Sequence, residues 1–126
     1  AEGRPEFRNV VRIAKWVAFR YGLSLTSFAV ETGVVEVGEN NKWTDMLGID
    51  VPRVFLGLAA IMANGFLADT FDPSKNLLEG TTAAQRSAAY EAYFSISGSI
   101  LDLHDHANDL TDDEMYHRVV ALFGDH

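Results

Sequence analysis

The sequence contains no cysteine and just three prolines among its 126 residues. The absence of cysteine excludes disulfide bonds, thiolate metal ligands and cysteine nucleophiles. It also favours a reducing, cytoplasmic compartment. Hydrophobic residues make up 48% of the chain, which is enough to build a folded core. We therefore expect one helical domain spanning residues 1–126, in which residues 1–4 form a flexible end or an expression scar without a function.

Basic residues are scarce, since 10 Lys and Arg face 18 Asp and Glu and leave a net charge of −8. Non-specific nucleic-acid binding needs clustered positive charge, so no nucleic-acid partner is expected. The charge is also uneven, with a net positive segment over residues 1–20 and a strongly negative one over residues 102–126. The two ends could pair within one fold, or they could join copies head to tail.

Apolar residues at helical spacing predict an all-α fold, a compact bundle of about four to five helices. The first helix is expected over residues 5–21, opened by Pro5 and closed by Gly22. Thr82 with Gln85, and Thr111 with Glu114, have the spacing of capping boxes. These pairs predict one helix from near residue 82 to about residue 106 and another that begins at residue 111.

Residues 23–37 fit two interpretations. Leu25, Phe28 and Ala29 lie on one face of a helix, whereas Val30 and Val34 are typical of strands. We expect a short helix followed by an extended or hairpin segment around residues 28–37.

A long apolar stretch runs from Val54 to Ala68 and is interrupted at Asn64. A membrane span needs about 20 apolar residues, so the stretch predicts a buried helix from Pro52 to about Thr70 instead. Its glycines, Gly57 and Gly65, lie two turns apart and predict close contact with another helix. Asn64 would then be a buried amide.

The helix expected over residues 82–106 carries two kinds of surface. One is apolar and the other consists of small residues, which suits packing against two neighbours. This helix is expected to be the centre of the domain or the core of a dimer. The apolar residues are Tyr90, Tyr93, Phe94, Ile96, Ile100, Leu101 and Leu103, and the small ones are Ala84, Ala88, Ala92, Ser95 and Ser99.

All four histidines lie in the last 23 residues, together with five of the chain's ten aspartates. On an unbroken helix a set of them would step by three or four positions along one face, and imidazole with carboxylate could bind a divalent metal ion. The opposing interpretation is helix-end chemistry, with histidines in a last turn and acids in a first turn. The candidate metal ligands are Asp102, His106, Asp109 and His117.

The first helix carries basic residues next to aromatic ones. This composition is common at the energetic centres of protein interfaces, and also at the edge of a packed core. The candidate interface residues are Arg8, Arg12, Lys15, Trp16 and Phe19.

The sequence offers no catalytic residues and no cofactor motif: there is no glycine-rich phosphate loop and no serine triad pattern. We therefore favour a non-enzymatic protein-interaction or structural assembly module that self-associates, with a homo-oligomer or another protein as its partner. The alternatives are a divalent-metal-dependent enzyme using the C-terminal His/Asp cluster, a small acidic inhibitor or immunity-type binding protein, and a membrane-associated helical protein.

Overall fold

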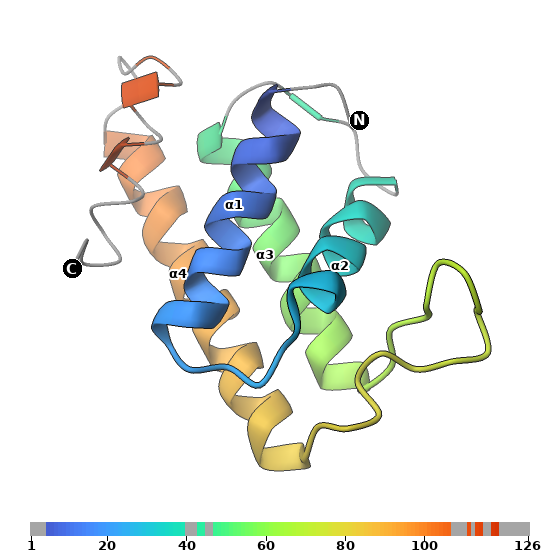
Figure 1. Ribbon diagram of the computed structural model, residues 1–126. Coiled ribbons are helices and arrows are strands. Elements are labelled where there is room, and N and C mark those ends of the chain that lie inside the picture. Colours follow the sequence, from blue (N-terminus) through green and yellow to red (C-terminus); the bar gives the residue numbers. More distant parts are fainter. Residues whose placement is uncertain are drawn as a thin grey trace.

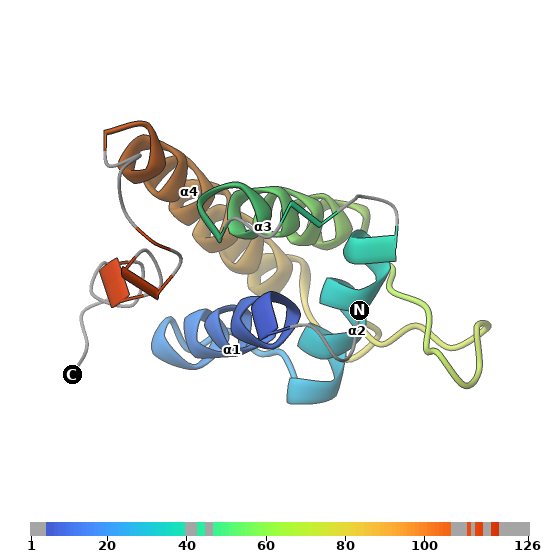
Figure 2. The ribbon, with the colours of Figure 1, turned by 90° about the horizontal axis from the view of Figure 1, so that it is seen from above.

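The computed structural model describes residues 5–39, 43–44, 47–106, 111, 113–114 and 117–118. Within these ranges the chain forms four α-helices and no strand, so the all-α bundle is confirmed. The helices α3 and α4 run side by side, and α1 and α2 cover one side of that pair (Figures 1 and 2). The helices are α1 (Pro5–Arg20), α2 (Ser27–Glu39), α3 (Leu47–Asn64) and α4 (Ala83–His106).

The core lies where the four helices meet. Each helix contributes fully buried apolar side chains, whose removal from water is the main favourable term in folding. The helices α1 and α3 bury the most apolar side chains, six each among the described residues. Core residues include Val10 and Val17 of α1, Val34 of α2, Phe55 and Leu58 of α3, and Tyr93 and Ile100 of α4.

The helix α1 ends as the sequence predicts. Gly22 takes a left-handed conformation with φ of 63°. The Leu23 N–H donates to the Ala18 carbonyl at 2.9 Å and the Gly22 N–H to the Phe19 carbonyl at 3.2 Å. These two bonds satisfy carbonyls that the end of the helix would leave unpaired.

The extended or hairpin segment expected around residues 28–37 is wrong, because α2 is helical throughout. Its first turn is capped by Thr26, whose hydroxyl accepts a hydrogen bond from the Ala29 N–H at 3.0 Å. Val30, Val34 and Val37 are strand-favouring residues, but at helical spacing they share one face and are buried. Their tertiary packing outweighs their local preference.

The helix α3 begins at Leu47 rather than at Pro52. Asp50 in its first turn is 2% exposed, and its Oδ1 accepts hydrogen bonds from the N–H and the hydroxyl of Thr44 at 2.9 and 2.8 Å. These bonds tie the preceding segment to the helix start. Pro52 lies inside the helix, and its carbonyl accepts a hydrogen bond from the Ser97 hydroxyl of α4 at 3.1 Å.

The end of α3 also differs from the expectation. Gly65 has φ of +76°, so it terminates the helix instead of packing within it, and residues 66–70 lie outside. Asn64 is exposed and not a buried amide. Among the described helices, none combines the length and the apolar character that crossing a membrane requires.

Gly57 confirms the expected close approach of another helix. A Cβ atom at this position would lie 2.5 Å from a methyl group of Val37 on α2. On α2 itself, a Cβ at Gly33 would lie 2.6 Å from Cδ2 of Leu58. The helices α2 and α3 therefore approach closely, and each contributes a glycine that leaves room for a side chain of the other.

The helix α4 starts with the predicted capping box. The Thr82 N–H donates to Gln85 Oε1 at 2.8 Å, and the Gln85 N–H donates to Thr82 Oγ1 at 3.0 Å. Further along, the buried hydroxyl of Tyr93 donates to the Ala14 carbonyl of α1 at 2.9 Å. Burial raises the pKa of Tyr93, so the hydroxyl stays a donor.

We expect Gly57→Ala to destabilise the protein by about 1–3 kcal/mol, because the β-branched Val37 cannot move its methyl groups aside. The matched variant Gly33→Ala should cost less, since it meets the rotatable end of Leu58. Urea unfolding of both variants measures the difference. Equal costs would show that the Val37 contact is not rigid.

Tyr93→Phe should destabilise the protein by about 1–2 kcal/mol, because it removes a buried hydrogen bond that joins α4 to the Ala14 carbonyl of α1. Tyr21→Phe is the control, since this tyrosine is exposed and should change stability little. Thermal and urea unfolding measure both. A neutral Tyr93→Phe would contradict the role of the hydroxyl.

Candidate functional site

The predicted metal ligands are partly within the described residues. Asp102 is exposed on α4, and His117 is exposed beyond it. The side chain of His106 and the whole of Asp109 lie outside the described residues. Where side chains are described, no group of three or more histidine, aspartate or glutamate residues could hold a metal ion. The four-residue metal site therefore stays a prediction.

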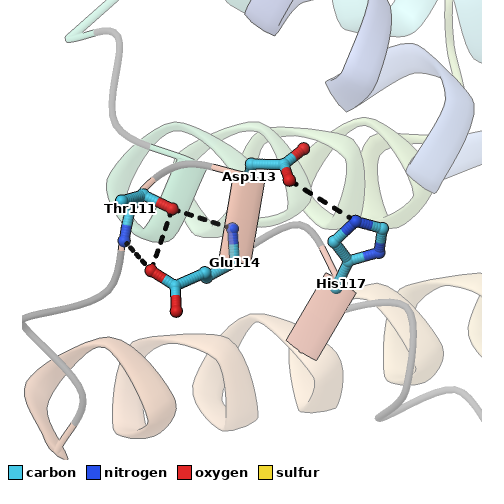
Figure 3. A network of polar contacts seen from close by, with 4 residues as sticks. All are labelled: Thr111, Asp113, Glu114 and His117. Atoms are coloured by element: carbon cyan, nitrogen blue, oxygen red, sulfur yellow. Dashed lines mark hydrogen bonds and ion pairs between the residues drawn. The ribbon is translucent and has the colours of Figure 1, made fainter.

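The described part of the C-terminal segment shows helix-end chemistry (Figure 3). The Thr111 N–H donates to Glu114 Oε1 at 3.0 Å and the Glu114 N–H donates to Thr111 Oγ1 at 3.1 Å, which confirms the second capping box. The Thr111 hydroxyl also donates to Glu114 Oε1 at 3.0 Å, and the two bonds from the Thr111 N–H and hydroxyl hold the pKa of the Glu114 carboxyl below its usual value. His117 Nε2 lies 3.6 Å from Asp113 Oδ2, one turn away.

The five predicted interface residues of α1 do not share one environment. Arg8, Arg12 and Phe19 are exposed, and Phe19 is 84% exposed. Lys15 forms an ion pair with Glu31 of α2 at 2.8 Å. Trp16 is half-buried and packs against the core. The fold thus exposes three of the five and gives the other two a place within the bundle.

Another apolar surface lies on the side of α3 and α4 that α1 and α2 do not cover. We call it the outer face. Its side chains are exposed, and Tyr90 and Phe94 stack with ring centroids 5.6 Å apart and an interplanar angle of 15°. Phe94 is 51% exposed. The outer face consists of Leu56, Ala60 and Ala63 of α3 and Tyr90, Phe94 and Leu101 of α4.

The outer face exists because the apolar residues of α4 extend beyond the stripe that the core buries, whereas Glu91, Ser95 and Ser99 lie on a polar side. Tyr93 and Ile100 point into the core, whereas Tyr90, Phe94 and Leu101, spaced by four and seven positions, point away from it. An apolar stripe wider than the core can bury is available for contact with a further partner.

The outer face is also poor in charge. Between Ala83 and Leu101, α4 holds one base, Arg86, and one acid, Glu91, and α3 adds the exposed Arg53 one turn before Leu56. The Arg86 guanidinium donates to the Thr81 carbonyl at 2.8 Å, so it is held at the start of the helix. Exposed surface that is apolar and nearly uncharged is a property of interaction sites.

Two further surface features lie apart from the outer face. Phe28 of α2 stacks on Phe71 of the loop that joins α3 to α4, with ring centroids 6.4 Å apart. A hollow of about 590 Å³ is lined by Phe7, Trp43, Glu31 and other residues. Its Glu31 is already paired with Lys15, and the two aromatic rings pack edge to face at 5.8 Å. Within the described part of the chain, the polar side chains that line the hollow besides Glu31 are Glu39 and Thr70.

No family model matches the chain, and searches of curated proteins and of solved structures give no match either. Any inference about function therefore rests on the all-α fold and on the surface of the chain.

Sequence reasoning missed the outer face. It assigned Tyr90, Phe94 and Leu101 to an apolar helix but did not separate them from the residues that build the core. The usable signal was spacing, since these three share one side of the helix and Tyr93 and Ile100 share another.

We expect Thr111→Val to raise the pKa of Glu114 toward its ordinary value, because the variant loses the hydroxyl that donates to Glu114 Oε1 and that accepts from the Glu114 N–H. The lowered pKa means that this cap stabilises the fold above the unfolded-state pKa of Glu114 and that its contribution disappears as the pH falls through the folded-state pKa. NMR titration of the Glu114 carboxyl measures the shift. Thr82→Val disrupts the other capping box and should leave Glu114 unaffected; a Glu114 pKa unchanged in Thr111→Val would contradict the assignment.

Proposed function

We propose that this chain is a non-enzymatic protein-interaction module whose function is assembly through self-association. The observation that carries the proposal is the exposed, apolar and nearly uncharged outer face of α3 and α4. Soluble monomers rarely leave large aromatic and aliphatic side chains together in water.

The outer face is a compact apolar patch. Tyr90 to Leu101 extend over about 17 Å of α4, and Leu56 to Ala63 over about 11 Å of α3, at 1.5 Å per residue. With about 10 Å for the width of each helix, the patch offers about 270 Å². A standard interface buries about 800 Å² on each partner, so the outer face would form the apolar centre of a contact whose rim is the surrounding, more polar surface.

The chemistry of the outer face supports binding rather than catalysis. Its six residues include no acid, no histidine and no serine, and Tyr90 alone has a polar group at its tip. Such a surface can exclude water and stack rings, but it offers no base or nucleophile to a substrate.

The charged ends of the chain would support a different assembly. Contact between the basic surface of α1 and a C-terminal acidic segment would weaken as salt screens the attraction. Contact through the outer face should persist in salt, because screening reduces the mutual repulsion of chains that each carry −8.

We expect the wild-type chain to form a discrete oligomer whose mass, measured by size exclusion with light scattering, is kept or raised at high salt. Phe94→Glu should return it to a monomer, because a charge would be buried at the contact. Phe19→Glu is the matched control, a more exposed phenylalanine on α1, and should leave the mass unchanged.

A wild-type chain that is monomeric at every concentration would refute self-association. An oligomer that dissociates in salt and in Phe19→Glu, but not in Phe94→Glu, would assign assembly to the basic surface of α1. Circular dichroism of each variant checks that helix content is retained.

A further inference from the structure

We infer that the outer face binds a second copy of this chain, through an antiparallel pairing of the two α4 helices about a two-fold axis at Phe94. The inference rests on the proposed self-association and adds the partner, the symmetry and the register. A two-fold contact of this kind is isologous, so each surface must be complementary to itself.

The register follows from helix geometry. When two antiparallel helices are related by a two-fold axis at Phe94, a residue four positions before Phe94 lies level with the residue four positions after it in the other copy. Tyr90 is therefore level with Gly98 of the second copy, and Ser87 is level with Leu101. At the axis, Phe94 meets its own copy.

This register places large residues next to small ones. Tyr90 shares its level with a glycine, and Leu101 shares its level with a serine. Interfaces between helices pack best when bulky side chains of one helix enter the space left by small residues of the other. The Tyr90–Phe94 stack seen within one chain would continue into the same stack of the second copy.

Gly98 provides an independent indication. It lies in the middle of α4, where glycine is less favourable than alanine. Among the described residues, no atom outside the helix's own backbone lies within 4 Å of where its Cβ would be. The packing of one chain thus gives no reason for a glycine here, whereas a tyrosine ring from a second copy gives one.

Charge favours a second copy over a basic partner. The chain carries −8, so two copies repel each other unless they meet on a surface that is nearly neutral. The six residues of the outer face are uncharged, and the charges at its edges are Glu91 and Arg86 of α4 and Arg53 of α3. A basic partner would gain nothing from this face.

The first test enlarges Gly98. In one chain the space around Gly98 is open, so Gly98→Leu should keep the fold. In the dimer the new side chain meets Tyr90 of the second copy and should raise the dissociation constant by about tenfold or more. Ser99→Leu, at the next exposed position and turned away from the pairing, is the matched control and should leave it unchanged.

The second test combines Gly98→Leu with Tyr90→Ala in the same chain. The leucine then occupies the space that the tyrosine of the other copy has vacated, so dimerisation should return to within about threefold of wild type. Sedimentation or light scattering over a concentration series measures the dissociation constant of the wild type, Gly98→Leu, Ser99→Leu and the double variant.

The third test uses the absence of cysteine. Level residues on facing helices have Cα atoms about 4–6 Å apart, given helix axes separated by about 8–10 Å, which suits a disulfide. The double variant Ser87→Cys with Leu101→Cys should form a covalent dimer on oxidation. Each single variant should not, because a residue at 87 lies about 21 Å along the axis from its own copy.

The outcomes separate the inference from the proposed function. A monomeric wild type overturns the proposed function and the dimer with it. A wild-type oligomer that survives Gly98→Leu, or whose single-cysteine variants cross-link as well as the double variant, overturns this pairing and leaves self-association standing through another surface. Loss in Gly98→Leu, rescue by Tyr90→Ala and cross-linking of the double variant alone support the pairing.

Discussion

The close contact between α2 and α3 is the constraint on which the rest of the structure depends. The valine methyl groups of Val37 occupy the space that Gly57 leaves, and Leu58 occupies the space that Gly33 leaves. Because interiors are packed at crystal-like density, this contact fixes how near the two helices lie. It holds α2 against one side of α3, so that α1 and α2 cover the core from that side and the outer face stays uncovered.

The same division continues in α4. Tyr93 enters the core, packs against Phe55 with ring centroids 5.0 Å apart and reaches the Ala14 carbonyl across the bundle. Phe94, the next residue, points away from α1 and α2 and is half-exposed. One helix thus stabilises the fold with one side and presents aromatic surface with the other, which ties the integrity of that surface to the stability of the core.

Local chemistry could be predicted from the sequence, and long-range packing could not. The cap at Gly22 and the capping box at Thr82 depend on residues within one turn, so their spacing is sufficient. The helical state of α2 depends on burial of Val34 against α1 and α3, which local strand preference cannot reveal. Composition likewise indicated an interface on α1, although Trp16 there packs against the core. The outer face could not be recognised in this way, because it is defined by which side of α4 the core occupies.

The proposed pairing also explains why assembly would stop at two copies. A two-fold contact uses the same surface of both chains, so the outer face is consumed once the dimer forms. What then faces solvent is the remaining surface of two chains that each carry −8, and further copies are repelled. A head-to-tail contact between a basic and an acidic end would instead leave one free end of each kind after every addition, and could continue into a ring or a filament. In the proposed dimer, the nearly neutral outer face would select the partner and the acidic remainder of the surface would limit the size of the assembly.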